Sequence, residues 1–164
     1  RPTRGVRARG LTVGFIETLP GNEAMLNTLQ VRDYMIRDPF LLSPSMSVTD
    51  AIAVLLAQGL AGAPVVEQGR LVGMFSESDG LKGALDAGYH QTGIGLVADY
   101  MSREVNRLDC HATVQEAAEM FLRNHRRCLP VVDGQRLVGQ LSRCDILRAV
   151  SARAESMPLE HTSN

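Results

Sequence analysis

The sequence predicts a mixed α/β (α+β) fold in which two copies of one strand–helix–strand–strand–helix unit pack about a pseudo-twofold axis. The first observation is a repeat, because residues 31–83 return without a gap as residues 97–149, an offset of 66 (97 − 31). The second is size, because one copy alone would have only a marginal core and packing against the other would remedy that. The third is composition: 45% of the residues are apolar and Trp is absent, so the core is aliphatic.

The elements of the first copy have local signals. Residues 41–42 predict a short strand, and a helix follows that either Ser47 or Thr49 can cap and that ends at Gly59. Strands at 63–66 and 70–75 form a hairpin about the turn Gln68–Gly69, and a second helix runs from about 79 to 88. The predicted buried stripe of the first helix is Val48, Ala51, Ile52, Leu55 and Leu56.

The second copy predicts the same order of elements. A short strand at 107–108 precedes a helix capped by Thr113, and strands at 129–132 and 136–141 join at an Asp133–Gly134 turn before a last helix from about 145 to 152. The predicted buried stripe here is Val114, Ala117, Ala118, Phe121 and Leu122. Met35 and Met101 stand at matched positions and are expected to pack where the two copies meet.

The expected organisation is an arm or linker at 1–28, copies at 29–92 and 93–153, and a polar tail at 154–164. The arm has four arginines among Gly and Pro, which fits either a linker or a basic arm that contacts phosphate or a partner. Because the chain begins with Arg rather than Met, we expect it to be part of a longer protein.

Composition excludes several classes of function. A net charge of −1 gives no field that would attract nucleic acid or an acidic membrane surface. No apolar run is long enough to span a bilayer and no signal peptide is visible, so we expect neither nucleic acid nor membrane as a partner. Cys110, Cys128 and Cys144 are an odd count without C-x-x-C spacing, which indicates reduced thiols in the cytoplasm and no zinc site. No residue spacing suggests a catalytic nucleophile, and we expect a protein that is not an enzyme.

The pattern Gly-x-x-Ser-x-x-Asp occurs once in each copy, where a strand ends and a helix begins. Its members are Gly73, Ser76 and Asp79, then Gly139, Ser142 and Asp145. One interpretation is a capping box, in which the Asp returns a hydrogen bond to the backbone of the Ser. The other is a ligand site, in which the helix start holds phosphate, the carboxylate holds ribose hydroxyls and the glycine lets a ligand approach the backbone.

The series Pro-Val-Val, Arg-Leu-Val-Gly and Ser-x-x-Asp, present twice and in phase, resembles the tandem cystathionine-β-synthase (CBS) domain, or Bateman module, over about residues 31–152. The resemblance implies a β-α-β-β-α fold for each repeat and two clefts between the repeats. It also implies a homodimer shaped like a flat disc, with an adenosine-containing ligand such as AMP, ADP, ATP or S-adenosylmethionine. The adenine nucleotide would be a regulatory ligand, and no cofactor is required.

The resemblance also implies roles for particular residues. The expected ribose ligands are the carboxylates Asp79 and Asp145. The expected ribose or phosphate contacts are the serines Ser76, Ser78 and Ser142. The expected adenine contacts are backbone atoms of Met46 and Ala112.

A basic run at 123–127 has no counterpart in the first copy. It fits either a solvated surface or the basic residues that the family places against phosphate, foremost Arg127 and Arg126, then His125. The second interpretation predicts one cationic cleft, in which Asp145, Ser142 and Arg127 hold a phosphorylated ligand, and one nearly neutral cleft. Gly80 replaces the apolar residue found in the second copy, which weakens its helix by about 1 kcal/mol and favours the Asp145 site.

Three hypotheses follow. The first is a non-catalytic sensor, in which an adenosine ligand brings the repeats closer, shifts a homodimer between arrangements and signals to an unknown effector protein. The alternative is a structural or dimerisation module with vestigial clefts, and the third is an enzyme or redox switch that uses the cysteines.

Overall fold

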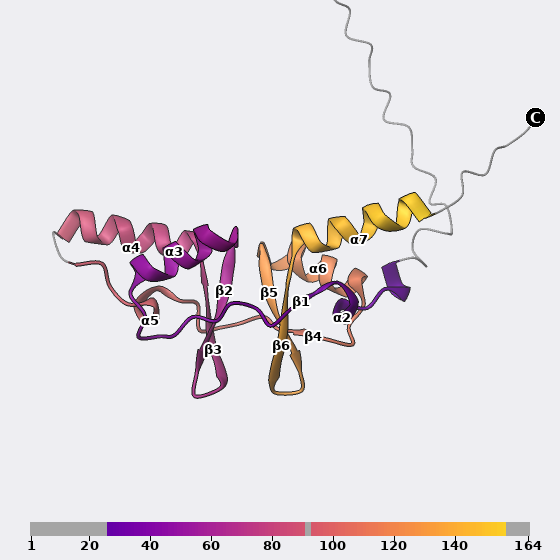
Figure 1. Cartoon of the computed structure of the whole chain (residues 1–164), viewed down its shortest axis with the longest axis horizontal. Helices are drawn as coiled ribbons and strands as arrows, with labels where there is room; N and C mark the ends of the chain where they lie inside the picture. Colours follow the sequence, from indigo (N-terminus) through magenta and orange to yellow (C-terminus); the bar gives the residue numbers. More distant parts are fainter. Residues whose placement is uncertain (1–25, 91–92, 157–164) are drawn as a thin grey trace, which may run out of the picture.

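The structure is a computed structural model that describes residues 26–90 and 93–156, and Figure 1 shows two similar halves side by side. Most of the predicted arm and tail, residues 1–25 and 157–164, lies outside the described residues. In chain order the elements are α2 (Val31–Tyr34), β1 (Ile36–Arg37), α3 (Val48–Gln58), β2 (Gly62–Glu67), β3 (Arg70–Ser76), α4 (Glu77–His90), α5 (Val97–Tyr100), β4 (Leu108–Asp109), α6 (Val114–Asn124), β5 (Cys128–Asp133), β6 (Arg136–Ser142) and α7 (Arg143–Ser156).

The two halves have similar sheets, but the second half has four strands and the first has two strands flanked by single bridges. The second half has the order β1-β6-β5-β4, in which β5 and β6 are an antiparallel hairpin and β4 runs parallel to β5. The first half has the antiparallel hairpin β2-β3, flanked by single bridges from Leu42 to Val65 and from Ser102 to Met74. The short strand predicted at 107–108 is observed one residue later as β4, whereas the one predicted at 41–42 is a single bridge at Leu42.

The two halves exchange their edge segments, which the sequence did not predict. β1 comes early in the chain, yet it pairs with β6, so that Ile36 faces Gln140. Val31 packs in the core that contains Leu108, and Val97 packs in the core that contains Leu42. The start of each sequence copy thus completes the half formed by the other copy, and segments of both copies line the junction.

Met35 and Met101 pack across this exchange, as predicted. The Met101 Sδ atom lies 2.8 Å from the point where a Cβ on Gly73 would stand, and the Met35 Sδ atom lies 2.6 Å from the same point on Gly139. We expected these glycines to admit a ligand to the backbone. That interpretation is wrong, because the space is taken by methionine from the other copy.

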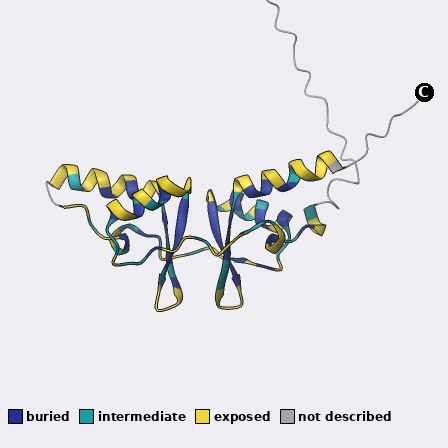
Figure 2. Ribbon diagram, viewed as in Figure 1, coloured by how far each residue is buried: buried dark blue, intermediate teal, exposed yellow. Residues whose placement is uncertain are grey.

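The central helices begin as predicted, and three members of each predicted stripe are buried: Val48, Ala51 and Leu55 in α3, and Val114, Ala117 and Phe121 in α6. The Ser47 hydroxyl accepts the Asp50 N–H at 3.1 Å, and Thr113 heads a capping box that begins α6. Leu56 is 78% exposed and Leu122 is 74% exposed, so their predicted burial is wrong. A surface helix buries a stripe only a little wider than about 100°, and these leucines lie outside it. Figure 2 shows in yellow how much of the helix layer is exposed.

The second hairpin turns one residue later than predicted. Asp133 pairs with Arg136 at the end of the ladder, so the turn residues are Gly134 and Gln135. The Asp-Gly pair is a strong turn signal, but Asp133 is the last residue of its strand, just as Glu67 is in the first copy, so the two hairpins turn at matching positions.

Candidate functional site

The Ser-x-x-Asp motifs cap the two long helices. One oxygen of Asp79, Oδ2, accepts both the Ser76 N–H at 2.8 Å and the Ser76 hydroxyl at 2.8 Å. Asp145 accepts from Ser142 in the same way, at 2.7 and 2.8 Å. The capping interpretation is therefore confirmed in both copies.

Capping uses only one oxygen of each carboxylate. Asp79 is 4% exposed and Asp145 is 7% exposed, so both are buried. The Oδ1 atom of Asp79 is 3.4 Å from Lys82 Nζ, and that of Asp145 is 3.0 Å from Arg148 Nη1. Both cationic side chains are mostly exposed and free to move toward solvent, so each Oδ1 remains able to accept a hydrogen bond from a ligand.

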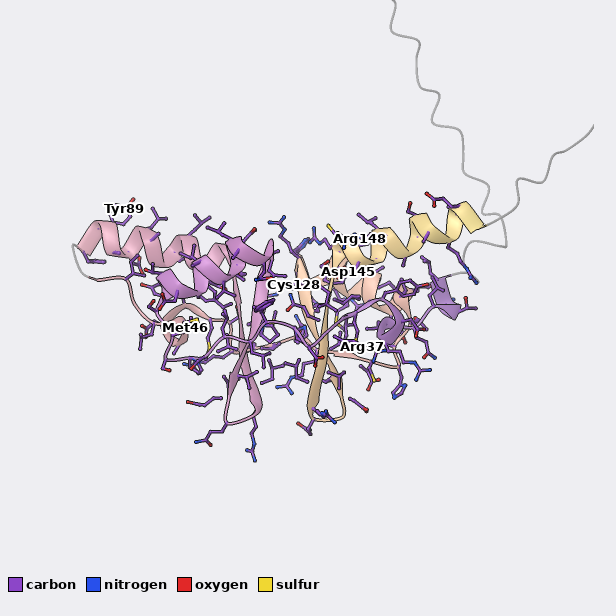
Figure 3. All side chains as sticks on the ribbon, viewed as in Figure 1. Arg37, Met46, Tyr89, Cys128, Asp145 and Arg148 are labelled. Carbon is purple, nitrogen blue, oxygen red and sulfur yellow. The ribbon has the colours of Figure 1, made fainter. Side chains whose placement is uncertain are left out.

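A cavity of about 200 Å³ opens at the junction of the halves, beside Asp79. Figure 3 shows Cys128, one of its lining residues, where the halves meet. Three chain segments supply most of the lining: the start of α4, the segment that follows α5, and the segment that leads into β5. Its polar residues are Ser76, Glu77, Ser78, Asp79, Lys82, Ser102, Glu104, Asn106, His125, Arg126 and Arg127.

The predicted partnership of Arg127 with Asp145 and Ser142 is wrong. The Arg127 guanidinium reaches across the junction, and its Nη1 atom lies 2.5 Å from Glu77 Oε2. Only its backbone stays near the other helix start, where its carbonyl oxygen accepts the Arg143 N–H at 3.2 Å. Backbone neighbours in a hairpin share a sheet, but their side chains can face different halves. The end of the basic run, residues 125–127, therefore lines the cavity beside Asp79. Neither Asp145 nor Ser142 lines this cavity.

The predicted cationic cleft is also wrong. Among residues 26–90 and 93–156, three cations line the cavity and three carboxylates do so as well, so their formal charges cancel. The cations are Lys82, Arg126 and Arg127, and the carboxylates are Glu77, Asp79 and Glu104. Glu77 could have been found from the sequence, because it follows the Ser of the motif directly. Glu104 could not, because nothing in the sequence shows that the second copy contributes residues 102–106 to this cavity.

Gly80 is a packing requirement and not a defect of the Asp79 site. It is buried, and a Cβ there would lie 3.0 Å from Ile52 Cγ1. The glycine thus lets α4 lie close against α3. The preference for the Asp145 site that we drew from this residue has no support in the packing.

The two residues that were expected to contact adenine do not line the cavity beside Asp79. Neither Met46 nor Ala112 lines the cavity, and Figure 3 shows Met46 well away from the junction. The Met46 carbonyl oxygen accepts the Val97 N–H at 2.9 Å, and that of Ala112 accepts the Val31 N–H at 2.9 Å. These carbonyl groups hold the short helices of the opposite copy in place.

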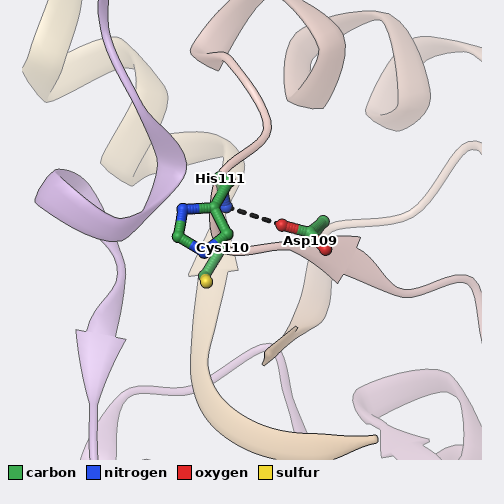
Figure 4. Close-up of side chains that lie close together, drawn as sticks. All are labelled: Asp109, Cys110 and His111. Carbon is green, nitrogen blue, oxygen red and sulfur yellow. Dashed lines mark hydrogen bonds between the residues drawn. The ribbon is translucent and has the colours of Figure 1, made fainter. Parts of the chain in front are cut away.

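A second cluster of polar side chains stands at the end of β4 (Figure 4). Ligand atoms of Asp109, Cys110 and His111 lie within 4.8 Å of one another. The Asp109 carboxylate accepts the His111 N–H at 2.7 Å, which is the geometry of a local turn. Burial raises the pKa of the Cys110 thiol, and a protonated thiol is a poor metal ligand. We assign no metal to this cluster.

Burial also raises the pKa of Cys128 to about 11, although Arg126 and Arg127 oppose the shift. This thiol faces the cavity in its protonated form at neutral pH. Within residues 26–90 and 93–156, no helix has both the length and the apolar character that a bilayer crossing requires.

Comparison with known proteins places this architecture. The profile of the CBS domain matches residues 31–85 and 97–152. The chain is 37% identical over 130 residues to an A-adding tRNA nucleotidyltransferase of Aquifex aeolicus, a match covering 79% of this chain and 15% of that enzyme. It is 27% identical to protein MJ1225 of Methanocaldococcus jannaschii over 74% of this chain and 43% of that protein. The chain thus spans less than half the length of these curated relatives.

Two solved structures are similar over nearly their whole length. The CBSX2 structure in complex with AMP is 29% identical, with a TM-score of 0.67 over 77% of this chain and 98% of that one. The CBS domain pair of protein MJ0100, in complex with 5′-methylthioadenosine and S-adenosyl-L-methionine, is 25% identical, with a TM-score of 0.67 over 76% and 97%. With a profile match in each copy and the fold of a CBS pair, this chain belongs to the CBS domain family.

Proposed function

We propose that the chain is a regulatory module that binds an adenosine-containing ligand in the cavity beside Asp79. The observation that carries the proposal is the meeting of a helix start and its buried carboxylate from one half with two arginines from the other. Support comes from the related CBS pairs, one of which binds AMP and another 5′-methylthioadenosine and S-adenosylmethionine.

In this proposal the ribose lies against Asp79. The Oδ2 atom is held by Ser76, and Oδ1 accepts a ribose hydroxyl when the Lys82 side chain moves away. The 14-residue helix α4 begins directly after Ser76, so its first turn presents N–H groups to a negatively charged substituent. Ser78 and Arg126 line the same cavity and would contact that substituent.

We propose a second cleft at Asp145 because the second half repeats the geometry of the first. Ser142 and Asp145 repeat the capping geometry of the first copy, and this carboxylate is buried as well. Its neighbours differ, because Arg143 stands at the position of Glu77 and Ala61 at the position of Arg127. We therefore expect the two clefts to differ in affinity.

Binding would move the halves relative to each other. The cavity volume of about 200 Å³ is below the range of about 300–1,000 Å³ that is typical of ligand pockets. A nucleoside would thus fit only after a shift at the junction, which makes ligand occupancy a conformational signal. The size of the signal is limited by the difference in ligand affinity between the two arrangements.

We also propose that the helix layer is covered by a second copy of the chain. Large apolar side chains are exposed on all four long helices, which share one side of the molecule in Figure 2. They are Leu56, Leu81, Leu85, Tyr89, Leu122 and Leu147. Several large apolar side chains exposed on one side of a molecule are typical of an interface. The three free cysteines agree with the reducing cytoplasm as its location.

The alternative is a structural module whose clefts stay empty. It is favoured by one observation, namely that both carboxylates already serve as helix caps. A variant of Asp79 would then lose stability for reasons unrelated to a ligand, so the test needs a matched control.

Asp145 supplies that control. Asp79→Ala and Asp145→Ala each remove one cap, and each should cost about 1 kcal/mol of folding stability. Isothermal titration with adenosine, AMP and S-adenosylmethionine should show binding by the wild type, loss of the cavity site in Asp79→Ala, and retention of that site in Asp145→Ala. Lower stoichiometry in Asp145→Ala would reveal the second cleft. Binding by Asp79→Ala at wild-type affinity would refute the assigned role, and no binding by the wild type would favour the structural module.

A further inference from the structure

The ion pair between Glu77 and Arg127 crosses the cavity and joins the two halves. The two residues are 50 positions apart in the chain, and their charged atoms lie 2.5 Å apart. The pair is half exposed, with side-chain exposures of 51% for Glu77 and 68% for Arg127. Such a pair contributes little to folding stability, so stability alone does not explain why it lies beside the buried carboxylate of Asp79.

Glu77 places a carboxylate where a phosphorylated ligand would put its own charge. A phosphate oxygen bound to Arg127 would lie about 2.8 Å from the guanidinium. Since Glu77 lies 2.5 Å from the same guanidinium, the two anions would be within roughly 5 Å of each other. Glu104 also lines the cavity, so the described residues of the lining supply no excess of cations to offset this repulsion.

We propose that Glu77 is a specificity-determining residue that excludes di- and triphosphates from the cavity. The inference rests on the proposed function and names the ligand class: adenosine derivatives with at most one phosphate, or with a substituent of low net charge. Each added phosphate brings charge near Glu77 and Glu104, whereas the nucleoside itself meets Asp79 and neutral groups. The other half lacks this device, because Arg143 replaces Glu77 there.

Isothermal titration with adenosine, AMP and magnesium-free ATP tests the proposal. The wild type should bind adenosine and AMP more tightly than ATP. Glu77→Gln should raise the affinity for ATP about tenfold, because a neutral amide replaces a unit charge within a few ångströms, and should leave the affinity for adenosine within about twofold. The gain should shrink as salt shortens the Debye length from about 30 Å at 0.01 M to about 3 Å at 1 M.

Two further variants control for charge and size. Glu67→Gln removes the same charge from an exposed position outside the cavity lining and should change nothing. Glu77→Asp keeps the charge and should keep the discrimination against ATP. If Glu77→Gln binds adenosine but gains no affinity for ATP, or if the wild type binds ATP as tightly as AMP, the proposal is overturned and the adenosine site stands. If none of adenosine, AMP and ATP binds to the wild type or to any variant, the adenosine site itself is refuted and the proposal with it.

Discussion

Gly73→Ala tests the exchange of edge segments, on which the shape of the junction depends. A methyl group at this position would stand 2.8 Å from Met101 Sδ and 2.9 Å from the Ser102 carbonyl oxygen. The methionine can change its rotamer, but the carbonyl oxygen accepts the Met74 N–H at 3.0 Å and cannot move without loss of that bond. The substitution should therefore push the segment from the second copy off the first half.

The expected cost combines two terms. Overpacking of a dense core costs about 1–3 kcal/mol. Loss of one backbone hydrogen bond adds about 0.5–1.5 kcal/mol, which brings the total to about 1.5–4.5 kcal/mol. Gly139→Ala should behave alike, because its methyl group would stand 2.6 Å from Met35 Sδ and 2.8 Å from the Ile36 carbonyl oxygen.

The assay is urea unfolding followed by far-ultraviolet circular dichroism, with the midpoint and slope compared across variants. Gly88→Ala is the control, since a Cβ there meets nothing within 4 Å and alanine should stabilise helix α4 by up to about 1 kcal/mol. The double variant Gly73→Ala/Met101→Ala should lose less folding stability than the two single variants lose together, because the contact with the methionine sulfur is gone. A loss below about 0.5 kcal/mol in Gly73→Ala, the level of an ordinary surface substitution, would show that the packing across the halves is wrong.

Two other predictions concern the surface and the thiols. Leu122→Glu, in the helix layer, should convert a dimer to a monomer in multi-angle light scattering, whereas Leu41→Glu, which lies outside that layer, should not; equal masses for both variants would contradict the proposed interface. Cys144 is exposed and should react with a thiol reagent first at pH 8, while Cys128, with its pKa raised to about 11, should react only as the pH rises above about 9 and the thiolate forms. Modification of Cys128 at pH 8 at the rate of Cys144 would contradict the burial of this thiol.

The features that the sequence predicted correctly are set by local chemistry. Ser47 and Thr113 cap their helices because a short hydroxyl side chain can reach the third N–H of the helix wherever the helix packs. The two hairpins form because apolar strands flank a turn of two residues in both copies. The internal repeat extends each such prediction to the other half, so errors in one copy can be checked against the other.

The features that the sequence could not predict depend on which half a segment joins. A repeat shows that two units are alike, but it is silent on whether the start of one unit packs with its own copy or with the other. Residues 31–37 and 97–102 pack with the other, so the glycine of each motif meets methionine and not a ligand. The same ambiguity led to the wrong partner for Arg127, whose backbone and side chain belong to different halves.

Arg127 is held at both ends, and this gives the cavity a physical connection to the second helix start. Its carbonyl oxygen accepts the N–H of Arg143, and Arg143 is the first residue of α7. Its guanidinium pairs with Glu77, the first residue of α4. A ligand that takes the place of Glu77 would break only the second of these contacts. Only a movement of the Arg127 backbone would reach α7, through the hydrogen bond from the Arg143 N–H to the Arg127 carbonyl oxygen. Any coupling of this kind between the cavity and the proposed cleft at Asp145 must be reciprocal, so a ligand at Asp145 would alter affinity at Asp79 by the same factor.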